Sequence, residues 1–303
     1  MINKRGVFFT ILVIVILSLF FLTYTFYSNV QERKTINQRI DTLNNFVFSN
    51  QQDTARKIKI SGFRIIFLLE KDMVESGEYI PNINTAFQEA FFNGTINGRN
   101  TPEITSIMAG ATYKDIKKDL SEKAYKINTN ISIYNPSISI LQEDPWNIKV
   151  SLNSTITIND LSNLALWNNT YLITAFVPIE NFEDPLYIIN TNGLVTNKIN
   201  KTIYGDFQNT SNLLPHTINS YYINSTDAPS FLDRIQGLNA PNPNGVESLV
   251  NLQKLSAQGI QVKDKSVVDH IYFSSVNPPA SQVSGMPSWF KLDAQHSAIY
   301  HPS

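Results

Sequence analysis

The stretch VFFTILVIVILSLFFLTYTFY, residues 7–27, contains twenty-one consecutive uncharged residues and directly follows a basic pair and a glycine. A helix rises about 1.5 Å per residue, so this stretch would span roughly 31 Å, close to the hydrocarbon thickness of a bilayer. Its few Ser and Thr residues can bond back to helix carbonyls at little cost. The sequence therefore predicts a transmembrane helix that begins at Val7 and ends at Tyr27.

Two other interpretations of this stretch fit less well. A buried core helix rarely stays apolar around its whole circumference for twenty residues. A cleaved secretory signal usually has an apolar region of about 7–15 residues and ends at a small-x-small site. Residues 23–28, Thr-Tyr-Thr-Phe-Tyr-Ser, offer no such site. A retained signal anchor is the favoured interpretation.

The residues in front of the helix carry a family resemblance. Lys4, Arg5 and Gly6 before an apolar stretch resemble the class III leader of type IV pilin-like proteins. The resemblance implies cleavage between Gly6 and Val7, which would make the apolar helix the mature N-terminus. At the fifth mature position, Ile11 replaces the glutamate of the bacterial pattern, a position at which archaeal leaders are looser. An uncleaved signal anchor has the same basic residues, so both alternatives stay open.

The orientation follows from the lengths of the two flanks more than from their charge. Lys4 and Arg5 favour a cytoplasmic N-terminus, but Arg33, Lys34 and Arg39 nearly balance them on the other side. Residues 1–6 are too few to form a domain, whereas the C-terminal portion is long and polar. We therefore expect a single-pass protein of the cell membrane with a cytoplasmic tail or leader at 1–6 and an ectodomain outside.

The composition excludes several classes of function. The 303 residues include 24 Lys and Arg against 25 Asp and Glu, so no net field attracts nucleic acid. Cysteine is absent, which excludes disulfides, thiolate metal sites and cysteine nucleophiles. The expected partners are the lipid bilayer and either a second copy of the chain or other membrane helices.

Seven Asn-x-Ser/Thr sequons are candidate glycosylation sites. With 34 Asn among 303 residues, of which 49 are Ser or Thr, chance alone gives about five or six sequons. The sequons thus permit glycosylation without arguing for it. They are Asn93, Asn130, Asn153, Asn168, Asn200, Asn209 and Asn224.

Residues 28–126 are predicted to be helical. Apolar residues recur at helical spacing over 29–50 and again over 53–75. A short helix is expected at 84–92. Thr101 and Pro102 are typical of a helix start, and the helix that they begin is expected to reach about residue 126. The first segment has a narrow apolar stripe that needs a partner, either the protein's own ectodomain or another chain. The stripe consists of Val30, Ile36, Ile40, Leu43 and Val47.

Residues 127–303 are predicted to form a β-rich ectodomain, which makes the fold class α+β. Asn135 and Pro136 indicate a turn, residues 146–158 alternate apolar and polar side chains, and residues 171–179 indicate a central strand. These segments favour an antiparallel sheet, folded over the helices or into a sandwich.

The C-terminal part of this region is rich in turns. Three further elements are expected there: strands at 186–189 and 265–274, and a short helix within 247–259. Residues 181–202 and 246–300 resemble segments of uncharacterised membrane-anchored archaeal proteins, a resemblance that implies no function.

No motif predicts a catalytic, cofactor-binding or metal-ligating residue, and no cofactor is expected. The four histidines are not in any metal-binding spacing, and no glycine-rich phosphate loop occurs. In a strand, Asp269 and His270 would point to opposite faces, which argues against a catalytic dyad. The acid pairs at 143–144 and 183–184 precede prolines and indicate turns. Three tryptophans could line a sugar-binding face, although core positions are more common for this residue in β-rich domains. They are Trp146, Trp167 and Trp289.

The leading hypothesis is a non-enzymatic membrane-anchored cell-surface protein for assembly or adhesion, in a pilin-like arrangement if the leader is cleaved. The alternative is an anchored envelope hydrolase that acts on glycan or peptide. It requires a concave cluster of acids, or a serine near His216 or His270. A ligand-sensing receptor is disfavoured because six cytoplasmic residues cannot hold a signalling domain.

Overall fold

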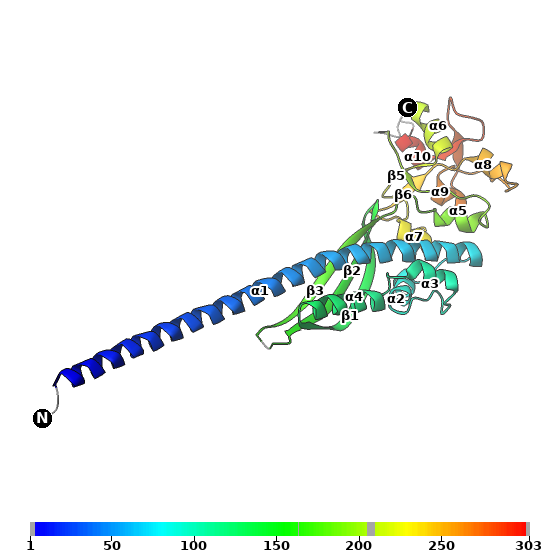
Figure 1. The fold of residues 1–303 in the computed structure, drawn as a ribbon. Helices are drawn as coiled ribbons and strands as arrows, with labels where there is room; N and C mark the ends of the chain where they lie inside the picture. Colours follow the sequence, from blue (N-terminus) through cyan, green and yellow to red (C-terminus); the bar gives the residue numbers. More distant parts are fainter. Residues whose placement is uncertain (1–3, 163, 205–209, 301–303) are drawn as a thin grey trace.

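One very long helix organises the chain (Figure 1). The structure is a computed structural model that describes residues 4–162, 164–204 and 210–300. Helix α1 is Lys4–Ser76, 73 residues, which corresponds to about 110 Å of helix. It contains the apolar stretch and both of the helical segments expected after it. Residues 50–53 continue the helix because they include neither proline nor glycine.

Only the second half of α1 packs against the rest of the protein. Side chains of residues 8–35 are exposed, and Leu43 is the first fully buried apolar side chain. The predicted stripe is therefore divided: Leu43 is buried in the core and Val47 packs against it, whereas Val30 stays exposed. The helix ends at Gly77, whose φ of 69° suits glycine and whose N–H bonds to the Met73 carbonyl.

A three-stranded antiparallel sheet crosses the second half of α1 (Figure 1). Its strands are β1 (Thr129–Asp144), β2 (Asn147–Asp160) and β3 (Leu166–Pro178), in the order β1-β2-β3. The predicted antiparallel sheet is thus confirmed, with two differences. The central strand is β2, not the segment at 171–179, and Asn135 and Pro136 form an irregularity inside β1 instead of a turn.

A glycine allows the close contact between helix and sheet. A Cβ on Gly62 of α1 would lie 2.9 Å from Val177 Cγ2 and 3.0 Å from Val150 Cγ2. Both valines are fully buried on the inner face of the sheet. Because side chains rarely approach a Cβ that closely, the absence of one at position 62 lets α1 lie directly on β2 and β3.

Three shorter helices pack beside α1. They are α2 (Ile83–Asn93), α3 (Pro102–Met108) and α4 (Tyr113–Lys126). Two of them, α2 and α4, also contact β1. The single helix expected from 101 to 126 is two helices, because Gly110 takes a φ of 75° and Thr112 starts α4 with a capping box to Asp115. The sequence signals at Thr101 and Pro102 do start α3, where the Thr101 hydroxyl caps the helix.

The C-terminal lobe, residues 179–300, is less β-rich than expected. Its helices and strands are short, and the strands form two small sheets, β4-β5-β6 and β7-β8. In chain order the elements are α5 (Pro185–Asn190), β4 (Asn200–Lys201), α6 (Thr210–Asn219), β5 (Tyr221–Asn224), α7 (Phe231–Ile235), β6 (Val246–Ser248), α8 (Leu252–Ala257), α9 (Asp269–Phe273), β7 (Ala280–Gln282), β8 (Lys291–Asp293) and α10 (Ala294–Tyr300).

Two predicted strands of this lobe are helices. The segment 186–189 lies in α5, where the Asp184 carboxylate caps the helix and Pro185 occupies its first turn. The segment 265–274 contains α9. Both helices are short and buried on most sides, so their apolar residues show no helical period. The helix expected within 247–259 is present only as α8, with β6 before it.

Apolar side chains form two cores. The first joins α1, α2, α4 and the sheet, and it extends to Phe231 and Ile235 of α7. The second lies within the C-terminal lobe and includes Val268 of the segment before α9 and Tyr300 of α10. The helical region before residue 127 and the sheet after it therefore share one core.

Candidate functional site

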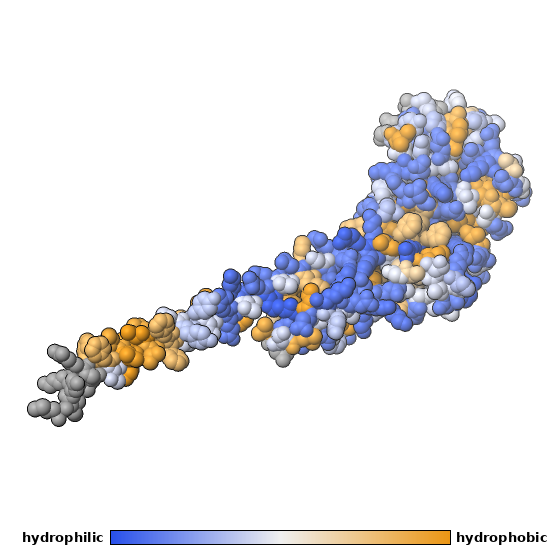
Figure 2. Space-filling model, in the orientation of Figure 1, coloured by the Kyte–Doolittle hydropathy of each residue, from blue (hydrophilic) through white to orange (hydrophobic). Residues whose placement is uncertain are grey.

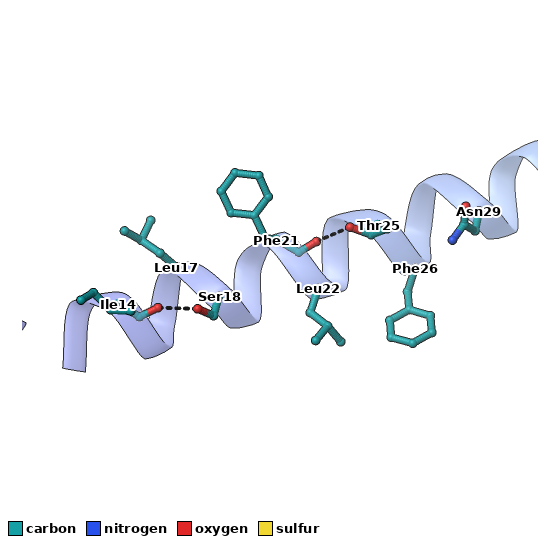
Figure 3. Close-up of a pocket in the computed structure, with 8 residues that line it drawn as sticks. All are labelled: Ile14, Leu17, Ser18, Phe21, Leu22, Thr25, Phe26 and Asn29. Atoms are coloured by element: carbon teal, nitrogen blue, oxygen red, sulfur yellow. Dashed lines mark hydrogen bonds between the residues drawn. The ribbon is translucent and has the colours of Figure 1, made fainter. Parts of the chain in front are cut away.

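The apolar part of α1 extends away from the folded body (Figure 2). It is the one helix in the described part of the chain that is long and apolar enough to cross a membrane, and none of its apolar window is buried. Side chains such as Phe21 and Phe26 project to opposite sides with no other element against them (Figure 3). Exposure on all sides distinguishes this segment from a core helix.

The hydroxyl residues of this segment have internal partners. Ser18 Oγ donates to the Ile14 carbonyl at 2.8 Å, and Thr25 Oγ1 donates to the Phe21 carbonyl at 2.7 Å (Figure 3). These bonds within the helix remove the cost of placing hydroxyls in hydrocarbon. The expected leader site, Gly6 and Val7, lies in the first turn of α1, and the residues before Lys4 are outside the described part.

Six of the seven sequon asparagines are exposed. They lie at the end of α2, in the sheet and in the C-terminal lobe, and the seventh, Asn209, falls outside the described residues. The exposed six are Asn93, Asn130, Asn153, Asn168, Asn200 and Asn224.

The three tryptophans do not share a surface. Trp146 and Trp167 pack partly against the first core, and Trp289 packs partly against the second. Lys201 Nζ lies 5.1 Å from the Trp146 ring centre. The arrangement does not bring the three rings together as a sugar-binding face would require.

A groove between α1 and α3 gathers acids, as the hydrolase alternative requires. It encloses about 340 Å³ and is lined by Asp72, Glu75 and Glu103 among others. All three acids are paired with bases: Asp72 with Arg99, and both Glu75 and Glu103 with Lys71. The two glutamates are exposed, and Asp72, which is buried, is held by Arg99 and Asn97, so this groove offers no unpaired acid and base for hydrolysis among its described residues.

The histidines have different environments. His216, in α6, has both ring nitrogens in hydrogen bonds, Nε2 with Thr202 Oγ1 and Nδ1 with the Asn212 carbonyl, each at 2.6 Å. This is a structural histidine. His301 lies outside the described residues, whereas His270 and His296 meet in the C-terminal lobe with their ring centres 5.7 Å apart.

Glu247 joins these two histidines in a buried cluster. Glu247 belongs to β6, His270 to α9 and His296 to α10, and their exposed fractions are 2%, 8% and 2%. One Glu247 oxygen, Oε2, is 3.9 Å from His270 Nδ1 and 3.6 Å from His296 Nε2. Both separations are too long for hydrogen bonds, and no described residue hydrogen-bonds to any of these three atoms.

Asp293, the last residue of β8, holds His296 in place. His296 Nδ1 lies 2.9 Å from each Asp293 carboxylate oxygen, and the His296 backbone N–H also donates to Asp293. The Ser266 hydroxyl donates to Asp293 Oδ2 at 2.8 Å. Burial alone would lower the pKa of His296, but Asp293 and the facing charge of Glu247 raise it to about 10. The same contact lowers the pKa of Asp293 below its usual range, against the effect of its burial.

A second buried charged group lies next to the cluster. The Arg234 guanidinium, fully buried, donates to Asp184 at 2.6 Å and to Asp269 at 2.9 Å. Asp269 also accepts from the Ser248 hydroxyl and from the backbone N–H of His270. Burial would raise the pKa of Asp269, but Arg234 lowers it, so this carboxylate stays charged. The network fixes the backbone of both β6 and α9.

The structure corrects the expectation for Asp269 and His270. The two residues were expected on opposite faces of a strand, but they lie in α9, where Asp269 Oδ1 is 3.5 Å from His270 Nδ1. Sequence reasoning also missed Glu247, Asp293 and His296, because Glu247 and His270 are far from the other two in the chain and the set matches no spacing motif. The pair Asp293 and His296, three residues apart, is the one local signal that could have pointed to the cluster.

The chain has no recognisable relative in the comparisons with known proteins: no family model, no curated protein and no solved structure matches it.

Proposed function

We propose that this chain is a non-enzymatic membrane-anchored cell-surface protein that takes part in assembly or adhesion. The observation that carries the proposal is the continuity of α1. One end of the helix is apolar on all sides and exposed, and the other end supplies the core of the folded body. A helix of this kind connects a lipid bilayer to an ectodomain without a hinge.

The continuity has a mechanical consequence. Between Tyr27 and the first half-buried residue, Ile36, α1 passes through roughly 12 Å with no other element against it. Because the backbone stays helical there, the ectodomain would be held at a fixed distance from the membrane surface. A rigid spacer of this kind keeps an ectodomain surface at one height and in one orientation, which favours adhesion or assembly. A flexible linker would instead let the ectodomain reorient.

An exposed apolar stripe on α1 supports assembly over simple display. Ile60, Phe63, Phe67 and Val74 are between 45% and 49% exposed. Their spacings of three, four and seven place them on one side of the helix. We define these four residues as the α1 stripe and propose that it packs against a second copy of the chain. If the leader is cleaved after Gly6, the arrangement would be pilin-like, with neighbouring helices packed side by side.

The anchored topology has a direct test. Full-length protein with a C-terminal tag should sediment with membranes, resist carbonate extraction and enter solution only with detergent. In intact cells, external protease should remove the tag, because residues 28–303 are proposed to lie outside. Protein that is soluble without detergent, or a tag that is protected until the cells are lysed, would contradict the proposal.

A further inference from the structure

The buried cluster of Glu247, His270 and His296 has features that an ordinary polar core lacks. Each residue contributes one ligand atom to the cluster: Glu247 Oε2, His270 Nδ1 and His296 Nε2 all lie within 4.8 Å of one another. All three side chains are more than nine-tenths buried, and within the described residues none of the three atoms has a hydrogen-bond partner. A buried polar atom without a partner lowers the stability of the folded state, so three such atoms close together call for a common partner.

We propose that Glu247, His270 and His296 bind one Zn²⁺ ion, which stabilises the C-terminal lobe. Two nitrogen or oxygen ligands at about 2.0 Å from a tetrahedral zinc are about 3.3 Å apart. The observed separations from Glu247 Oε2, 3.6 Å and 3.9 Å, are close to that value. A small inward movement of the side chains would complete the geometry, with a water molecule in the fourth position.

The surroundings of His296 match those of a metal-bound histidine. A ligating histidine usually donates its other ring N–H to a carboxylate or carbonyl, which fixes the ring and the tautomer. Here Nδ1 of His296 faces the Asp293 carboxylate, so the opposite nitrogen, Nε2, is directed at the cluster. Asp293 thus holds the His296 ring, and Ser266 in turn holds Asp293 through a hydrogen bond.

The ligand types select the metal. Two imidazoles and one carboxylate suit zinc, whereas calcium and magnesium prefer sites made wholly of oxygen. Copper also binds imidazole, but it favours square-planar arrangements, in which adjacent ligands at about 2.0 Å from the metal are about 2.8 Å apart. The separations of 3.6 Å and 3.9 Å from Glu247 Oε2 are closer to the tetrahedral value.

The burial of the cluster indicates a structural site and not a catalytic one. Three protein ligands and a water are also the ligand set of catalytic zinc, but a catalytic site must admit substrate, and here every ligand residue is at most 8% exposed. The three ligands come from β6, α9 and α10, so one ion would join three short elements. In a chain without cysteine, a metal can supply the cross-link that disulfides supply in many small domains.

Metal analysis of the detergent-solubilised full-length chain tests the proposal. Protein loaded with zinc chloride and dialysed should retain one zinc per chain by mass spectrometry. Removal of the zinc with EDTA should lower Tm by about 5–10 °C, and added zinc should restore it. Protein loaded with Co²⁺ should show the strong visible absorption of a tetrahedral site, a readout that needs no variant.

Four variants locate the site. Glu247→Gln and His270→Gln each remove one ligand, so the zinc affinity should fall more than a hundredfold and Tm should no longer respond to zinc. Asp293→Asn removes only the support for His296 and should weaken zinc binding by about 10–100-fold. His216→Gln changes another buried histidine, one that lies outside the cluster, and should leave the zinc content at one per chain.

Two results would overturn the proposal. One is folded wild-type protein that binds no zinc beyond traces and whose Tm does not respond to EDTA or zinc. The cluster would then be an ion pair between protonated His296 and its two carboxylates. The other is zinc binding that Glu247→Gln and His270→Gln leave unchanged, which would place the metal elsewhere.

Discussion

At the scale of single residues, this protein buries several of its charged groups in pairs, and Glu70 on α1 is an exception. Arg234 is matched by Asp184 and Asp269, and Arg39 is matched by Asp160. Glu70 is 6% exposed and has no such cation. Its Oε1 oxygen has no hydrogen-bond partner among the described residues.

Glu70 should make the stability of the protein depend on pH. Burial raises the pKa of Glu70 well above its usual value, and the charges of Glu183 and Asp184 add to the effect. The folded state therefore holds the proton more tightly than the unfolded state, and stability falls as pH rises from the unfolded pKa to the folded one. Each tenfold difference in proton affinity between the folded and unfolded states changes the free energy of unfolding by about 1.4 kcal/mol.

Glu70→Gln should therefore be more stable than wild type at pH 7.5, and the two proteins should converge near pH 4. Thermal unfolding between pH 4 and 8 measures the difference. Glu75→Gln, at an exposed position on the same helix, serves as the control and should follow the wild-type curve. Parallel curves for Glu70→Gln and wild type would show that Glu70 ionises normally in the folded protein.

At the scale of elements, the sheet and α1 form one tightly packed unit. The close approach depends on Gly62, because the space that a side chain would need is filled by Val150 and Val177. Interiors packed at this density resist even one added methyl group. At position 62 the steric conflict of an added side chain should outweigh helix propensity, which by itself favours alanine over glycine by about 1 kcal/mol.

A double-mutant cycle isolates this contact. Gly62→Ala should destabilise the wild-type protein, because overpacking costs about 1–3 kcal/mol. In a Val177→Ala background the same change should cost clearly less, since the contact at 2.9 Å is gone and only the contact with Val150 at 3.0 Å remains. The coupling energy should exceed about 1 kcal/mol. Lys59→Ala, on an exposed part of α1, should show no coupling to Val177→Ala.

At the scale of the whole molecule, the long helix places an apolar rod at one end and a two-core body at the other (Figures 1 and 2). The α1 stripe lies on the body, on the same helix that is proposed to enter the membrane. Copies anchored in one bilayer with rigid, parallel helices would bring these stripes to the same height. Anchoring thus favours lateral association by raising the local concentration and fixing the orientation.

The absence of cysteine makes this association easy to test. Ile60→Cys, on the α1 stripe, should give a disulfide-linked dimer in oxidised membranes. Lys118→Cys, on the exposed side of α4, should remain monomeric under the same conditions. Equal cross-linking at both positions would indicate random collision, and no cross-linking at position 60 would argue against packing through the stripe.

The sequence by itself determined the elements whose signal is local. The apolar stretch, the extension of α1 and the alternating strand at 146–158 follow from side chains within one element, because burial on a single face leaves a period in the sequence. Only the tertiary structure decided α5 and α9, which are buried on most sides and show no period. It also decided the meeting of Glu247, His270 and His296, which lie on three elements of the folded lobe. Ligand atoms converge through packing between elements, and that packing leaves no spacing in the chain.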